Sequence, residues 1–211
     1  MNAKPIPDTA RGQPLRVAAR DIVMGVHWSP RSGHAEGESA ANLDAMCLLL
    51  DARGEPLEVV SPTHLKNANG SVMHTGDSPT GASVWDDERV FVFSGALPET
   101  VHTAVFAVAS RDGRAFAQVA GAACHVSDQQ TEEQLIALKL TALGALSRYC
   151  VAALVRDGDG WLLTQDARYD AVLDRVVAAA RERVHAPDSA SRDAGPRTAD
   201  DAHSSANRSA T

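Results

Sequence analysis

The chain is most informative where residues 69–81 read NGSVMHTGDSPTG and residues 86–88 read DDE. Four carboxylates and several turn-forming residues lie in this short span, directly before the apolar run at 90–93. Carboxylates so close together repel one another unless solvent or a cation compensates for their charge. Ca²⁺ is such a cation, because it takes about six to eight oxygen ligands in a flexible geometry. The span is therefore either a solvated acidic turn or part of a Ca²⁺ site.

On both sides of this span, short apolar runs alternate with turn signals. Runs of strand length cover residues 21–28, 44–50, 57–60, 90–93, 103–110, 116–119, 148–155 and 161–164. Turn signals separate many of them, such as Asn69-Gly70, Asp112-Gly113 and the Asp-Gly repeat at 157–160. Many short strands at fairly regular spacing are typical of a β-sandwich or barrel. The sequence predicts a mainly β fold.

Two further segments bear on helix content. Over residues 169–184, apolar residues recur on one face of a period of about 3.6 residues, which predicts an amphipathic helix. Residues 131–134 resemble a helix capping box, whereas apolar residues alternate over 136–140 as they would in a strand. The segment that follows residue 131 is therefore compatible with either a strand or a short helix.

The two ends of the chain differ from its middle. Residues 186–211 are rich in Ala, Ser, Asp, Arg and Pro and contain no large apolar side chain. Such a composition cannot offset the entropy that a chain loses when it becomes ordered. Near the N-terminus, prolines discourage regular structure. We therefore expect a flexible segment over 1–16, a β-sandwich domain over 17–185 and a disordered tail over 186–211.

The charge balance bears on the class of protein. Acidic residues outnumber basic ones by 27 to 20, which gives a formal net charge of -7. This balance argues against a nucleic-acid-binding protein, which normally carries a basic patch or stripe. No apolar run is long enough to cross a bilayer, and no apolar core follows Lys4 as it would in a signal peptide. We expect a cytoplasmic protein without direct membrane insertion.

The sequence offers few groups for catalysis. Cys47, Cys124 and Cys150 lie far apart, and this pattern predicts buried free thiols rather than disulfides. Cys124 precedes His125, but adjacent side chains in a strand point to opposite faces, so they are not expected to form a nucleophile–base pair. The Asp-Gly repeat at 157–160 lacks the Glu that completes an EF-hand, and no phosphate-binding loop or Ser-His-Asp motif appears. We expect a protein that is not an enzyme.

The order of these motifs resembles the TerD-type tellurium-resistance and stress-response family. The family has a strand ending in Gly-x-x-Trp, then a polar loop and Asp-Leu-Asp-Ala; this chain has Gly25-Val26-His27-Trp28 and Asn42-Leu43-Asp44-Ala45. Residues 70–81 match the family's Gly-Ser-Val-x-His-Thr-Gly-Asp-Asn-x-Thr-Gly hairpin, and residues 85–88 match its Gly-Asp-Asp-Glu. With weaker matches at 115–119 and 160–161, the resemblance runs from about Val17 to Val184.

The resemblance implies a two-sheet β-sandwich whose connecting loops bind Ca²⁺. The family's ligand positions correspond here to Asn42, Asp44, Asp77, Asp86, Asp87 and Glu88. Carboxylates from separate loops are able to converge on one ion, and backbone carbonyls near Gly76 and Gly81 would complete its coordination. The family further implies a non-enzymatic role that is exerted through other stress-response proteins.

Several positions depart from the family pattern. Asn42 replaces an Asp, and Ala40-Ala41 offers no side-chain oxygen just upstream. Ser78 replaces an Asn, and residues 82–85 replace a more acidic, glycine-rich connection, with Trp85 standing where the family has Gly. Because Ca²⁺ affinity depends on ligand charge and site rigidity, we expect weaker binding or a single site. The alternative is a metal-independent scaffold or interaction module with a degenerate site.

Overall fold

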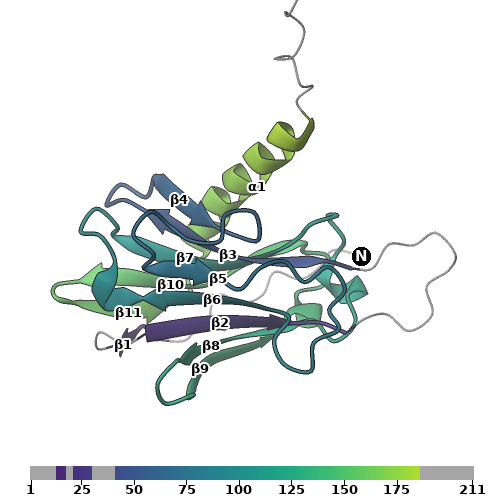
Figure 1. Ribbon diagram of the computed structural model, residues 1–211, viewed down its shortest axis with the longest axis horizontal. Helices are drawn as coiled ribbons and strands as arrows, with labels where there is room; N and C mark the ends of the chain where they lie inside the picture. Colours follow the sequence, from purple (N-terminus) through teal and green to yellow (C-terminus); the bar gives the residue numbers. More distant parts are fainter. Residues whose placement is uncertain (1–12, 18–20, 30–40, 186–211) are drawn as a thin grey trace, which may run out of the picture.

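The computed structural model describes residues 13–17, 21–29 and 41–185, which form two stacked β-sheets and one long helix (Figure 1). All strand pairings in the two sheets are antiparallel. The helix lies on the outer face of one sheet, so that this sheet is covered on both sides (Figure 1). The predicted mainly β sandwich with a C-terminal helix is confirmed.

Both sheets combine strands that are distant in the sequence. In spatial order, the first sheet consists of β1 (Leu15–Val17), β11 (Gly160–Thr164), β10 (Arg148–Asp157), β7 (Thr103–Ser110), β3 (Leu43–Leu50) and β4 (Pro56–Val60). The second sheet consists of β5 (Val72–His74), β6 (Glu88–Phe93), β2 (Asp21–His27), β8 (Ala123–Asp128) and β9 (Gln134–Lys139). The helices in the described residues are α1 (Asp170–His185) and the short 3-10 turns η2 (Ser94–Ala96), η3 (Phe116–Gln118), η4 (Leu140–Leu143) and η5 (Ala167–Tyr169).

The main core lies between the two sheets and follows the alternation of side chains along each strand. Ile22, Met24 and Val26 of β2 are fully buried there, because every second residue of a strand points to the same face. β7 is buried at every position, since α1 packs on the outer face of the first sheet through Leu173 and Val177. This second apolar layer is why the first sheet carries long apolar runs rather than a clean alternation.

One predicted strand is wrong and one open alternative is resolved. Residues 116–119 were predicted as a strand, but residues 116–118 form the 3-10 turn η3 and Val119 follows it as the C-cap. The amides of Phe116 and Ala117 donate to the carbonyl oxygens of Leu146 and Gly144. These hydrogen bonds hold the segment against the η4 region instead of in a ladder. The segment that begins near a capping-box pattern is the strand β9, which pairs with β8 with one register shift beside Leu135. Tertiary pairing decides such a segment, and local sequence does not reveal it.

The two segments that flank the predicted domain lie mostly beyond the described residues. Residues 1–12 of the predicted flexible segment and the predicted disordered tail at 186–211 lie outside the described residues, as does Ala40. β1 begins at Leu15 and pairs with β11, so a strand starts inside the predicted flexible segment 1–16. In the part of the chain that the structure describes, no helix is long and apolar enough to cross a membrane.

The cysteines are all buried, whereas the tryptophans are divided between core and surface. All three cysteines are buried and none forms a disulfide, as predicted. Trp28 and Trp161 belong to the core between the sheets. Trp85, by contrast, is 75% exposed, and its neighbour Val84 is 90% exposed. The chain therefore presents an apolar pair in the loop that precedes β6.

Candidate metal centre

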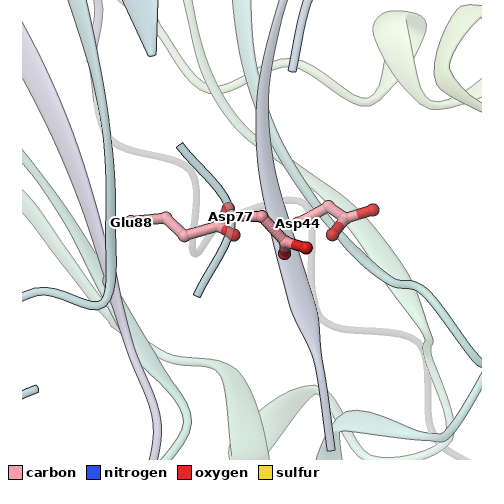
Figure 2. A group of neighbouring side chains, drawn as sticks. All are labelled: Asp44, Asp77 and Glu88. Atoms are coloured by element: carbon pink, nitrogen blue, oxygen red, sulfur yellow. The ribbon is translucent and has the colours of Figure 1, made fainter. Parts of the chain in front are cut away.

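Three of the six predicted ligands come together near the first residues of β3 and β6. Asp44 lies on β3, Glu88 begins β6, and Asp77 lies in the loop that follows β5 (Figure 2). One carboxylate oxygen from each lies within 4.8 Å of the others. Two oxygens that ligate the same Ca²⁺ are at most about 5 Å apart, because each Ca–O distance is about 2.3–2.6 Å. The three side chains therefore satisfy the distance requirement for a shared cation.

Glu88 is the fixed member of this group. It points into the sandwich because it alternates with the buried residues Val90 and Val92 along β6. The side chain is 0% exposed, and both of its oxygens accept main-chain hydrogen bonds. Ala45 N donates to Oε2 at 2.8 Å, and Ser78 N donates to Oε1 at 3.1 Å. A buried carboxylate held in this way has a defined position before any cation binds.

His74 on β5 supports the same carboxylate from the other side. The amide of Gly76 donates to its Nδ1 at 2.9 Å, so the ring proton is assigned to Nε2. Nε2 lies 3.1 Å from Ala45 O and 3.3 Å from Glu88 Oε2. β4 pairs with β3 only from Cys47 onward, so no described strand pairs with Ala45 on that side. Side chains of the second sheet thus satisfy both main-chain groups of Ala45.

Two oxygens at the start of β3 lack partners. Oδ1 of Asn42 and Oδ1 of Asp44 are buried, and neither accepts a hydrogen bond from any residue that the structure describes. Burial raises the pKa of Asp44 to about 6; Arg111 opposes this shift, whereas the neighbouring carboxylates add to it. Buried polar atoms nearly always have partners. A hard cation held by Asp44, Asp77 and Glu88 would supply a partner for the Asp44 carboxylate, so this donor set fits Ca²⁺.

A cationic side chain already stands beside the group. Arg111 Nη1 donates to Asp77 Oδ2 at 2.9 Å, and its Nε lies 4.0 Å from Asp44 Oδ2. Asn42 Nδ2 donates to the other oxygen of Asp77 at 3.3 Å. Arg111 was not among the predicted site residues. It offsets part of the negative charge that the three carboxylates bring together.

Asp87 has a different set of partners. Its Oδ2 accepts a hydrogen bond from Trp28 N at 2.9 Å, and its Oδ1 accepts one from Ser83 N at 2.9 Å. His27 Nδ1 lies 3.0 Å from the same Oδ2. The carboxylate therefore joins the loop before β6 to the end of β2. The structure does not place it in the group of Asp44, Asp77 and Glu88.

Asp86 also lies outside that group, in a chain of polar side chains. Its oxygens lie 3.1 and 3.2 Å from His125 Nε2, and Arg89 Nε donates to Oδ2 at 2.7 Å. Burial alone would raise the pKa of Asp86, but hydrogen bonds from His125 and Arg89 outweigh it and lower that pKa. Asp86 is therefore a charged partner of His125 and Arg89 at neutral pH.

This polar chain continues to a serine, which gives a Ser-His-Asp order in space that no sequence motif indicated. Ser127 Oγ lies 2.7 Å from His125 Nδ1. However, Ser127 is only 4% exposed. A cavity of about 320 Å³ beside the chain is lined by His125 and Asp86 but not by Ser127. The contacts from Ser127 through His125 to Asp86 join β8 to the loop before β6.

Both the sequence and the fold match those of known proteins. A family model described as the TerD domain matches residues 10–168. The chain belongs to the TerD family. It is 32% identical over 153 residues to tellurium resistance protein TerZ of Serratia marcescens, a match that covers 70% of this chain and 79% of that protein. It is 31% identical over 148 residues to general stress protein 16U of Bacillus subtilis (strain 168), a match that covers 66% of this chain and 76% of that protein.

A solved TerD-type structure shares the fold. The crystal structure of a homologue of telluride resistance protein (TerD) from Streptomyces coelicolor A3(2) superposes with a TM-score of 0.62. The match covers 71% of this chain and 88% of that chain, at 17% identity. All six predicted ligands lie within the residues that match the TerD domain model. The predicted membership of a tellurium-resistance and stress-response family is confirmed.

Proposed function

We propose that this TerD-family protein binds one Ca²⁺ ion through Asp44, Asp77 and Glu88, and acts in the stress response without catalysis. The observation that supports this most is the approach of the three carboxylates to within 4.8 Å. The buried oxygens of Asn42 and Asp44 add to it, because they have no hydrogen-bond partner among the described residues and such atoms normally have one. Every donor in the set is an oxygen, which is what a hard cation prefers.

A single site of modest affinity accounts for the arrangement best. Asp86 and Asp87 are engaged with His125, Arg89, Trp28 and Ser83, and these hydrogen bonds would have to break before either carboxylate could ligate a second ion. Ca²⁺ affinity rises with the number of charged ligands. Asn42 contributes no charge, which lowers the expected affinity of the site that remains.

We propose that the protein is not a catalyst because its serine and cysteine side chains that resemble nucleophiles are buried. Ser127 is buried within the polar chain that it forms with His125 and Asp86. Burial raises the pKa of Cys124 to about 12 and raises that of Cys47 as well. Since the thiolate is the reactive form of cysteine, these thiols are not prepared to reduce a tellurium oxyanion. We therefore propose that the protein does not transform tellurite itself.

We propose that the protein acts through a partner protein, because two neighbouring apolar side chains are exposed. Val84 and Trp85 are 90% and 75% exposed, and they precede the acidic residues of the loop before β6. Exposed tryptophans are enriched at the centres of protein interfaces. The partner would be another stress-response protein, as the family resemblance implies, and the expected place of action is the cytoplasm.

Thermal melting tests the Ca²⁺ proposal directly. The midpoint should rise as Ca²⁺ is added and fall back with EGTA, because a ligand that binds only the folded state stabilises it by about 2.7 kcal/mol at 100 times its Kd. Asp44→Asn should abolish this rise. Asp159→Asn removes the same charge from the exposed turn between β10 and β11 and should leave the rise unchanged. No rise for the wild-type protein in excess Ca²⁺ would contradict the proposal.

A metal-independent interaction module is the second candidate function. It is favoured by one observation, namely that Arg111 already pairs with Asp77 and lies near Asp44. In such a module the arginine would replace the ion permanently. The same melting experiment separates the two candidates, because the module predicts identical midpoints in Ca²⁺ and in EGTA.

A further inference from the structure

Arg111 occupies a position that the topology of the first sheet determines. It directly follows β7, whose last residue, Ser110, pairs with Leu43 at the start of β3. The main-chain amide of Arg111 donates to Asn42 O at 3.0 Å. The pairing of β7 with β3 thus fixes the backbone of Arg111 beside the first residues of β3. From there the side chain reaches Asp44 and Asp77.

The contacts of the guanidinium are with the carboxylates that define the candidate metal centre. Nη1 donates to Asp77 Oδ2 at 2.9 Å, and Nε lies 4.0 Å from Asp44 Oδ2. Among the described residues, no other arginine or lysine forms an ion pair with these two carboxylates. Without Arg111, the carboxylates would lose the guanidinium that lies beside two of them, and their mutual repulsion would destabilise the fold.

We infer that Arg111 is a built-in counter-cation that competes with Ca²⁺ for Asp44 and Asp77. This inference rests on the proposed function, because it assumes that the three carboxylates bind Ca²⁺. Two cations beside the same carboxylates repel one another, so Ca²⁺ binding has to displace the guanidinium or bear its repulsion. The side chain is 43% exposed and has a long flexible stem, so it can move into solvent.

The competition has two consequences of opposite sign. In the absence of Ca²⁺, Arg111 stabilises the folded protein by reducing the repulsion among the carboxylates. In the presence of Ca²⁺, the same contacts weaken metal binding, since the free energy of the arginine–carboxylate pairs is lost. A residue that only supports the loop would weaken both properties when it is replaced. The sign of the effect on affinity therefore distinguishes competition from structural support.

The experiment compares Arg111→Gln with the matched variant Arg114→Gln in the full-length protein. Arg114 carries the same charge three residues away and pairs with Asp112 at 3.2 Å. Ca²⁺ affinity is measured by titration calorimetry, and the melting midpoint is measured separately in EGTA. Arg111→Gln should bind Ca²⁺ about 10-fold more tightly than the wild type, a typical coupling between two linked sites. Its midpoint in EGTA should be lower than that of the wild type, and Arg114→Gln should show the wild-type affinity.

Each outcome has a defined meaning. If the wild type and Arg114→Gln bind Ca²⁺ and Arg111→Gln binds it equally or more weakly, the competition is wrong while the proposed function stands. If Arg111→Gln binds Ca²⁺ and the wild type does not, Arg111 blocks the site in the natural protein: the competition is supported, and the proposed Ca²⁺ binding by the natural protein is wrong. If none of the three binds Ca²⁺, both the proposed function and the competition are overturned. Arg111→Lys keeps the charge without the planar guanidinium, so its Ca²⁺ affinity should lie between those of the wild type and Arg111→Gln.

Discussion

The carboxylate of Glu88 on β6 accepts a hydrogen bond from the main-chain amide of Ala45 on β3, at 2.8 Å, and so links the two sheets. Ala45 needs this partner because the pairing of β4 with β3 does not extend to it. An ionised acceptor makes such a hydrogen bond about twice as strong as a neutral one. Glu88 therefore has a structural role in addition to its place among the candidate ligands.

Glu88→Gln tests this structural role. Glutamine keeps the size of the side chain but turns an NH₂ group toward either Ala45 N or Ser78 N, where a donor would face a donor. We expect the free energy of unfolding in EGTA to fall by about 1–3 kcal/mol, the usual penalty for a buried unsatisfied donor. Urea unfolding measures it. An unchanged or increased free energy of unfolding would show that the hydrogen bonds of Glu88 do not stabilise the sandwich.

Asp44→Asn should have the opposite effect on stability in EGTA. Asp44 is largely buried, its Oδ1 has no partner among the described residues, and two other carboxylates lie close to it. Removing its charge relieves both the desolvation and the repulsion, so the melting midpoint at pH 7.5 should rise. The same variant loses the Ca²⁺ response. A lower midpoint in EGTA would mean that the charge of Asp44 is stabilised by Arg111 more than it is destabilised by burial.

The pH dependence of the wild type in EGTA follows from the same group. Burial raises the pKa of Asp44 to about 6, from 3.8, so the folded state binds the proton more tightly than the unfolded chain does. The stability that protonated Asp44 contributes to the folded state is present in full below pH 3.8 and is lost as the pH rises through about 6. It amounts to about 3 kcal/mol, since one pKa unit corresponds to about 1.4 kcal/mol. The free energy of unfolding in EGTA should therefore be larger at pH 5 than at pH 7.5, and Asp44→Asn should reduce this difference.

Much of the fold was predictable because apolar runs and turns locate strands. The strands β2, β3, β7, β10 and β11 agree with the predicted runs to within a few residues. The error at 116–119 has a physical cause, since Phe116 is buried in a turn and so gives the same apolar signal as a strand residue. The strand β9 was left open because its hydrogen-bond partner, β8, is not visible in local sequence.

The sequence predicted six possible ligands, but it could not show which of them come together in one site. The motif resemblance supplied six positions, but it did not say which side chains share a face. The structure separates Glu88, which points inward, from Asp86, which pairs with His125. Arg111 could have been found by a different signal: once β3 and β7 are taken as antiparallel neighbours, the end of one lies beside the start of the other. The arginine was missed because runs and turns locate strands without saying which strands are neighbours.

Gly25→Ala tests the polar chain around Asp86. Gly25 lies on β2, and a Cβ added there would stand 2.4 Å from both Asp86 Oδ2 and His125 Nε2. The two side chains would have to separate, so we expect a loss of about 1–3 kcal/mol in the free energy of unfolding, as for other overpacked sites. Gly95→Ala is the matched control, since nothing lies within 4 Å of its added Cβ. Equal stability of the two variants would show that the Asp86–His125 contact is dispensable.

Leu173→Ala tests whether α1 is an integral layer of the domain. Leu173 is 1% exposed and belongs, with Val105 and Leu48, to the apolar cluster on the outer face of the first sheet. Truncating it removes several buried carbons and leaves a cavity, so we expect a loss of about 2–5 kcal/mol. Arg175→Ala on the same helix removes only an exposed ion pair with Glu55, which is worth about 0–1 kcal/mol. If Leu173→Ala costs no more than Arg175→Ala in urea unfolding, the helix contributes little to the stability of the sandwich. If the predicted difference is found, the long apolar runs of β3 and β7 are explained by burial on both faces of the first sheet.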